Sequence, residues 1–293
     1  MKRYRVTAMQ WDTTPIVLKM EIKDDWTEQA KRNMRHEKEQ IRGRLALRFG
    51  QLGLDQKVQN LSDIGIFPFS IISFHNQFLE QARNAFVMAF YYPALASACA
   101  LGERVLNHLM LLLRKDFDGT PEYKEVHKLK TFDDWHLPIR VLWAWGVLLP
   151  KAVDAFKRLR TIRNKSLHFH PSTDTEARQQ ALTALHTFQE IVNAQFSTFG
   201  DQPWFIPMSA GVSFIKRDHE HKPFVKRVVL PSCRLVGTDH EMFPTMQGPW
   251  DITDHSKDIV GECSDEEFMR LHMVANQRRA GVPATVNTAP STP

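Results

Sequence analysis

The chain has 293 residues, of which 43% are hydrophobic and 24% charged, an ordinary composition for a soluble globular protein of one large or two modest domains. Its formal net charge of +5 suits an anionic partner such as RNA. Three widely spaced cysteines, Cys99, Cys233 and Cys263, argue against a disulfide framework and for a reducing compartment. No apolar signal opens the chain, and polar residues interrupt its most apolar stretch, 94–113, so we expect a cytoplasmic protein without a membrane span.

The first 75 residues are predicted to hold two strands and a basic helix. Residues 4–9 and 16–22 are β-prone and are joined by a turn that contains Pro15. Residues 24–49 are predicted to form a helix rich in lysine and arginine. Such a helix is more often a solvated helix that lies across a domain than an arm that follows phosphates. Residues 50–75, with several glycines, are predicted to be a connection.

Two apolar helices are predicted next, over 78–91 and 94–116, with Pro93 at the break. In the second, small and polar residues share one flank, which allows another helix to approach closely. Glu103 lies on this flank. A further helix is predicted over 133–148, with an aromatic and aliphatic stripe. The stripe could stack nucleic acid bases, but at this spacing it more often belongs to a core. Its members are Trp135, Ile139, Leu142, Trp143 and Trp145.

Residues 151–167 are predicted to form an amphipathic helix. Val153, Phe156, Leu159 and Ile162 share an apolar arc, and Arg163 falls inside that arc. Because a guanidinium does not lose its proton, an arginine on a buried face needs a carboxylate, a phosphate or a subunit interface. Arg163 is therefore a candidate functional residue.

His168 follows Arg163 by five positions, where we expect the helix to end. Pro171 disfavours helical geometry at His170, and the carbonyl end of a helix favours a protonated imidazole. Histidine and arginine together supply what RNA cleavage without a metal requires, because one moves a proton and the other neutralises the phosphate. Residues five apart lie about 140° apart on a continuous helix. Either His168 swings back in a frayed last turn, or the pair forms across two copies of the chain.

The sequence from Arg163 and Asn164 to His168 resembles the motif of the HEPN superfamily, small helical domains found in many RNases. The resemblance covers residues 75–198 and implies an up-and-down helical bundle that forms a homodimer with a composite RNase site. It further implies a cytoplasmic defence or toxin effector and a neutralising or regulatory protein. HEPN toxins paired with nucleotidyltransferases often have tyrosine two positions after the histidine; His170 stands there, so control by modification of such a tyrosine is not expected.

Two further sets of residues accompany the motif. The resemblance implies that Glu103 orients Arg163 and that Asn164 holds part of the site; the other interpretation of Glu103 is a buried ion-pair partner. A basic cluster lies on the motif helix, and it either forms the polar face of that helix or leads phosphates toward Arg163 and His168. We favour the second interpretation for its members, Lys157, Arg158, Arg160 and Lys165.

A capping pattern at 173–176 predicts a long helix to about 198, and prolines then punctuate short β-prone runs, such as 212–215 and 224–230. Ser264 begins a pattern that predicts a last helix to about 279. Metal-ligand residue types occur here without the spacing of a zinc site, so no metal or cofactor is expected. They are His219, His221, Cys233, His240, His255 and Cys263.

The sequence thus predicts a mainly α protein: a HEPN-like bundle with a small β-containing region formed by the N- and C-terminal segments. Predicted domain ranges are 1–74 for the N-terminal strands and basic helix, 75–199 for the bundle, 200–279 for the β-rich region and 280–293 for a disordered tail. The predicted activity is a metal-independent endoribonuclease that leaves 2′,3′-cyclic phosphate and 5′-hydroxyl ends. The alternative is a non-catalytic HEPN-like module that binds RNA or protein. No common nucleotide-binding or hydrolase motif occurs.

Overall fold

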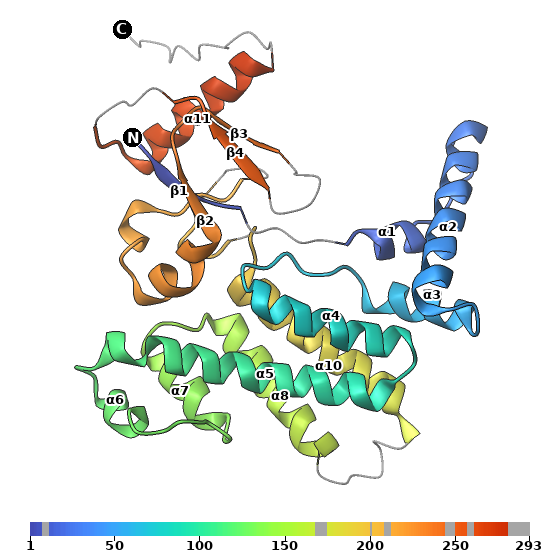
Figure 1. The fold of residues 1–293 in the computed structure, drawn as a ribbon, viewed down its shortest axis with the longest axis horizontal. Helices are drawn as coiled ribbons and strands as arrows, with labels where there is room; N and C mark the ends of the chain where they lie inside the picture. Colours follow the sequence, from blue (N-terminus) through green and yellow to red (C-terminus); the bar gives the residue numbers. More distant parts are fainter. Residues whose placement is uncertain are drawn as a thin grey trace, which may run out of the picture. The chain divides into compact units, whose positions relative to one another are not determined.

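The computed structural model describes residues 1–7, 12–167, 175–199, 201–207, 212–243, 250–256 and 261–280. The chain divides into two compact units. One combines Met1–Met9 with Thr198–Pro293, and the other is Gln10–Ser197. The second unit contains the predicted basic helix and connection together with the helices of the predicted bundle. Figure 1 shows the elements of both units.

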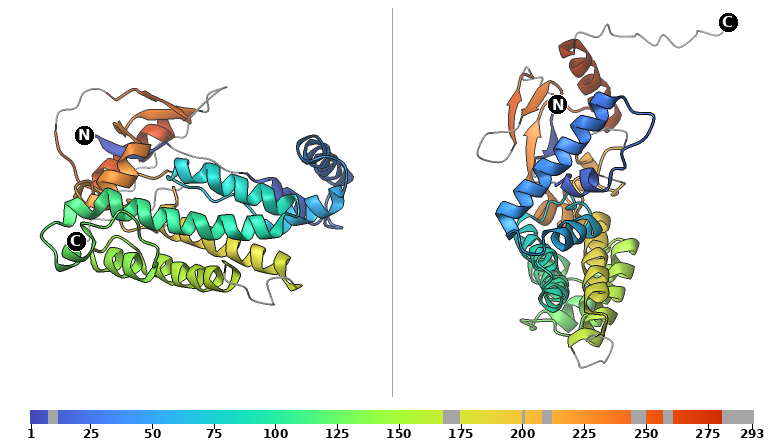
Figure 2. Two further views of the ribbon diagram at one scale, coloured as in Figure 1. Left: turned by 60° about the horizontal axis from the view of Figure 1, so that its bottom comes forward. Right: turned by 90° about the vertical axis from the view of Figure 1, so that its right-hand side faces the viewer.

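The larger unit is built around four long helices, which confirms the mainly α class. Figures 1 and 2 show these helices packed alongside one another, with a short helix, α7 (His136–Ala144), beside α5 and α8. Pro121–Val126 forms the short α6. None of the helices in the described ranges combines the length and hydropathy that a membrane crossing needs. The four are α4 (Ser73–Val87), α5 (Tyr91–Leu113), α8 (Pro150–Leu167) and α10 (Ala177–Ile191).

Burial of one face of each helix forms the core of this unit. Leu95, Leu106, Phe156 and Leu185 are inaccessible to solvent, at 0% exposure. Each such side chain contributes ~1.5–3 kcal/mol when it leaves water. The sequence predicted the break between α4 and α5 at Pro93; it lies at 88–90, where Ala89 has φ of 63°. Pro93 instead occupies the first turn of α5, where its missing N–H has no intrahelical acceptor to lose.

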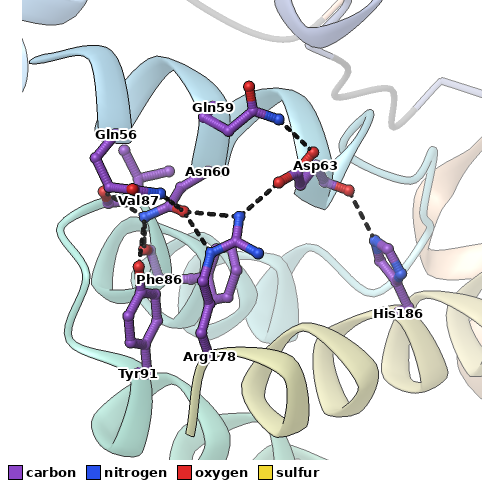
Figure 3. A network of polar contacts seen from close by, with 9 residues as sticks. All are labelled: Gln56, Gln59, Asn60, Asp63, Phe86, Val87, Tyr91, Arg178 and His186. Atoms are coloured by element: carbon purple, nitrogen blue, oxygen red, sulfur yellow. Dashed lines mark hydrogen bonds and ion pairs between the residues drawn. The ribbon is translucent and has the colours of Figure 1, made fainter. Parts of the chain in front are cut away.

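A polar network anchors α3 (Leu54–Ile64) to the bundle (Figure 3). The Nδ2 atom of Asn60, which is fully buried, donates to the carbonyl oxygens of Phe86 and Val87 at the end of α4. Arg178, at the start of α10, donates to Asn60 Oδ1 at 3.1 Å and to Asp63 Oδ2 at 2.5 Å. The network fixes the first turn of α10, which is the element that follows the predicted motif in the sequence.

The N-terminal part of this unit corrects two sequence predictions. Residues 50–75 were expected to be a connection, but Leu54–Ile64 within them forms the helix α3. Residues 16–22 were expected to form a strand, but Thr14–Lys19 forms the helix α1. The amide of Thr14 donates to Asp12 Oδ1 at 2.9 Å, and Pro15, in the first turn, has a φ suited to a helix. These two local constraints outweigh the β propensity of Ile16 and Val17. The predicted basic helix is confirmed as α2 (Glu28–Phe49).

The smaller unit holds two short antiparallel sheets, which confirms a β-containing region from both terminal segments. Strand β1 (Arg3–Val6) pairs with β2 (Cys233–Val236) in the register Arg3 to Val236. Strand β3 (His240–Phe243) pairs with β4 (Asp251–Asp254). The last helix is confirmed as α11 (Asp265–Arg279), with Ser264 accepting from the Glu267 amide. The predicted tail after Ala280 lies outside the described residues.

Residues 224–230 correct a further prediction, because Val225–Val229 is helical rather than extended. Phe224 and Val225 are both buried although they are consecutive, whereas a strand would place them on opposite faces. Pro223 precedes the segment, and the amide of Lys226 donates to the Lys222 carbonyl oxygen. A proline in a first helical turn explains why this β-prone run coils.

Two histidines stack inside the smaller unit. His240 and His272 are 1% and 3% exposed, and their ring centroids lie 4.8 Å apart. His240 Nδ1 donates to the Gly237 carbonyl oxygen, and its Nε2 is buried without a hydrogen-bond partner among the described residues. Burial, and then the nearby Arg5 guanidinium, lower the pKa of His240 to about 3. Both rings are therefore held neutral near neutral pH.

This pair predicts that acid destabilises the smaller unit. An unfolded histidine has a pKa near ~6.5, so the unfolded chain binds the proton first as pH falls. The contribution of the neutral His240 ring to stability is therefore present above ~pH 6.5. It is lost progressively as pH falls toward the pKa of about 3 in the folded protein. Between ~pH 7 and ~pH 5.5 we expect His240 alone to lower the free energy of unfolding by roughly 1 kcal/mol.

Thermal unfolding of the full chain across this pH range measures the effect. The His240→Phe variant, which carries no titratable ring, should show a smaller pH dependence than the wild type. Equal pH dependence in the two proteins would contradict this assignment.

Candidate functional site

Helix α8 places Arg163 at the edge of the core. Ala152, Ala155, Phe156 and Leu159 on this helix are fully buried, and α8 packs against α5 and α10. Arg163 lies one turn beyond Leu159 and therefore on the same side of the helix. Its side chain is 26% exposed. The guanidinium is thus neither sealed in the core nor free in solvent.

Glu103 on α5 holds this guanidinium. Arg163 Nη2 lies 3.2 Å from Glu103 Oε2, and the Glu103 side chain is 33% exposed. Trp135 Nε1 donates to the same carboxylate oxygen at 3.1 Å. Because Trp135 is 1% exposed and is fixed by packing, its indole gives the carboxylate a defined position. Ion pairs this exposed contribute ~1 kcal/mol or less to stability, so stability alone is a weak reason for the pair.

Gly102 permits the close packing behind this pair. A Cβ atom at position 102 would lie 2.6 Å from Trp135 Cη2 and 2.8 Å from Leu159 Cδ2. Real Cβ atoms do not approach other heavy atoms so closely. The absent side chain lets α5 lie against both Trp135 and α8, and this contact places Glu103 opposite Arg163.

The other donors of Arg163 are only partly used. Nη1 donates to the side-chain oxygen of the exposed Asn164 at 3.3 Å. Nε is buried and has no hydrogen-bond partner among the described residues. A buried N–H without a partner is rare. The exposed part of the side chain, and not this buried atom, is open to an anion such as a phosphate oxygen. His168, His170 and Pro171 lie outside the described residues, as do Thr173 and Asp174 of the predicted cap.

The members of the predicted basic cluster face different neighbouring helices. Arg158 pairs with Glu190 on α10. Lys157 and Arg160 instead line a groove shared with α7, and Arg160 Nη2 lies 3.6 Å from Asp134 Oδ1. Lys165 is exposed in the last turn of α8. The structure therefore brings only Lys157 and Arg160 of this set into one groove.

Sequence reasoning missed the segment that joins these features. Asn107 on α5 accepts from the Phe132 amide at 2.8 Å and donates to its carbonyl oxygen at 3.3 Å. These two hydrogen bonds to Phe132 fix the backbone just before Asp134 and Trp135. Asp134 contacts Arg160, and Trp135 contacts Glu103. Asn107 belongs to the predicted small and polar flank that also holds Glu103, but that pattern did not predict its partner, which is 25 residues away.

The stripe over 133–148 is mostly core, with one exception. Trp135, Ile139, Leu142 and Trp145 are buried, which confirms the favoured interpretation for them. Trp143 is 49% exposed. A helical wheel could have predicted this exposure, because it places Trp143 about 40° beyond Ile139, on the side away from the other members of the stripe.

The thiol next to the site is not reactive. Cys99 is fully buried, and burial raises its pKa to about 11 despite a hydrogen bond with Ser166 and the charge of Arg163. Thiol nucleophiles require a lowered pKa. In the described ranges, no cluster of three or more histidine, cysteine or acidic side chains is arranged to bind a metal ion.

No protein-family model matches this chain, and neither a curated protein nor a solved structure matches it.

Proposed function

We propose that this chain is a metal-independent endoribonuclease of HEPN type that works as a cytoplasmic homodimer. The observation that carries the proposal is the state of Arg163: a permanent cation at the core edge, oriented by Glu103 and still 26% exposed. Such an arginine is prepared for an anion. The nearby cations Lys157 and Arg160 make a polyanion the best match.

In the proposed reaction a ribose 2′-hydroxyl attacks the adjacent phosphorus. His168 moves the proton, the bond from phosphorus to the 5′-oxygen breaks, and a 2′,3′-cyclic phosphate and a 5′-hydroxyl are the products. Arg163 neutralises the charge that grows on the phosphate oxygens. Glu103 acts as a positioning residue through Arg163, and Asn164 binds near the same oxygens.

The dimer is proposed because Arg163 and His168 are five positions apart, about 140° around a continuous helix. Arg163 of one copy would then work with His168 of the other. By the same family resemblance, we propose a role in defence or as a toxin, with a protein that neutralises or regulates it.

A second candidate is a HEPN-like module that binds RNA or protein without cleavage. The observation that favours it is that Glu103 already occupies Nη2 of Arg163 and is itself held by Trp135. In this case the ion pair is structural, and no variant of it would alter a cleavage rate.

The test is incubation of the purified full chain with single-stranded RNA in EDTA, followed by analysis of the new termini. The proposal expects cleavage that persists in the chelator, cyclic phosphate ends, and no cleavage of the same strand made with 2′-deoxyribose. Absence of cleavage, or cleavage of the deoxy strand, would reject it in favour of the binding module or of another chemistry.

A further inference from the structure

A groove between α7 and α8 combines an exposed indole with positive charge. Its volume is about 390 Å³, and both helices contribute to its lining. Trp143 lies in it with 49% of its surface exposed, although tryptophan is usually buried on average. Polar residues that line it are His136, Arg140, Asp154, Lys157 and Arg160.

The groove is lined by three cations and one carboxylate, Asp154. Two of the cations form ion pairs with carboxylates that do not line the groove. Arg140 lies 2.5 Å from Glu125, and Arg160 lies 3.6 Å from Asp134. Both arginines remain about two-fifths exposed, at 43% and 38%. Ion pairs of this exposure are weak, so they orient the guanidinium groups and still yield to a phosphate.

Beyond Arg160, α8 continues to Arg163, which lies about 60° further around the helix. Lys157, Arg160 and Arg163 recur every third residue, which corresponds to steps of about 4.5 Å along the helix axis. Asp134 contacts Arg160, and the next residue, Trp135, contacts Glu103. One segment of chain therefore contacts both a groove cation, Arg160, and the carboxylate that holds Arg163.

An exposed indole beside spaced cations matches single-stranded nucleic acid. A base stacks on the aromatic face, and the backbone phosphates meet the lysine and arginines. A duplex offers no free base faces for such stacking, and an acidic peptide offers charge without a planar base. The charge and the indole together thus favour one occupant.

We propose that the groove of Trp143, Arg140, Lys157 and Arg160 binds a single-stranded segment of the RNA, with one base stacked on Trp143. This inference rests on the proposed function and names the form of its substrate. The bound strand would run along α8 toward Arg163.

The test measures binding of a fluorescent, fully 2′-O-methylated oligouridine to the full chain by anisotropy. Methylation removes the attacking hydroxyl, so binding is measured without cleavage. Trp143→Ala should weaken binding about 10-fold, because stacking contributes substantially per base, and Trp143→Phe should restore most of it. Tyr92→Ala is the matched control: this aromatic on α5 is 52% exposed and lies outside the groove, so its loss should leave affinity unchanged.

The charge component is tested through salt dependence. Lys157→Gln and Arg160→Gln should each reduce the slope of log K against log salt by about 0.7. Arg42→Gln, an exposed arginine of α2, should not change it. The inference is overturned if the wild type does not bind the strand, if a duplex or a polyglutamate peptide binds as tightly, or if Trp143→Ala binds as the wild type does. Wild-type binding with the expected variant effects, but no RNA cleavage, would reject the endoribonuclease and leave the groove assignment standing.

Discussion

The Arg163→Lys variant is expected to cleave RNA about 100-fold more slowly than the wild type, although the positive charge is kept. The guanidinium divides its donors between Glu103 through Nη2 and Asn164 through Nη1, and the side chain remains 26% exposed to an added acceptor. An ammonium group is a single point of charge and cannot contact Glu103 and a phosphate in the same planar geometry. Single-turnover cleavage in EDTA measures the loss.

Arg42→Lys is the matched control, because Arg42 also pairs with a carboxylate, Asp55, at 2.5 Å. It lies on α2, and its replacement should leave the rate unchanged. If Arg163→Lys cleaved RNA at the wild-type rate, positive charge alone would be sufficient and the orientation provided by Glu103 would have no role.

The Gly102→Ala variant is expected to lower the free energy of unfolding by about 3 kcal/mol, at the upper end of overpacking effects. The added Cβ would lie 2.6 Å from Trp135 and 2.8 Å from Leu159. Trp135 is 1% exposed, so its indole can shift only if neighbouring core side chains move as well. Any shift of its indole also disturbs the hydrogen bond to Glu103, so cleavage should slow as well. Chemical denaturation gives the stability, and the EDTA assay gives the rate.

Gly43→Ala controls for the removal of a helical glycine. Nothing lies within 4 Å of a Cβ at Gly43 on α2, so this change should stabilise the protein by ~0.5–1 kcal/mol. If Gly102→Ala were as stable as the wild type, the close packing of α5 against Trp135 would not be essential to the site.

The sequence was sufficient to predict the helices that bury one broad apolar face. The periodic patterns predicted α5 and α8, and the misplaced charge of Arg163 indicated a partner, since both interpretations of Glu103 put it nearby; the two side chains lie 3.2 Å apart. Periodicity is a local property, and burial of a continuous apolar face decides these elements. For the same reason Ile16 and Val17 were misassigned to a strand. Their segment is short and has no periodic apolar face, so the hydrogen bond from the Thr14 amide to Asp12 and the proline at position 15 determine that it is helical.

The contacts around the site could not be predicted, because they depend on distant residues that meet only in the fold. Asn107 fixes Phe132, and Asp134 and Trp135 then reach two different helices. The basic cluster looked uniform in sequence because no acid occurs between Asp154 and Asp174. In the structure, carboxylates from other elements, such as Glu190 and Asp134, divide its members.

The central claim is that Arg163 and His168 process a phosphodiester, and single-turnover cleavage of one RNA in EDTA by the wild type, Arg163→Ala and His168→Ala tests it most directly. We expect the wild type to cleave and each variant to lose at least ~100-fold in rate. Binding of the 2′-O-methylated strand by His168→Ala should stay close to that of the wild type. A wild type that cleaves no faster than either variant would contradict the account.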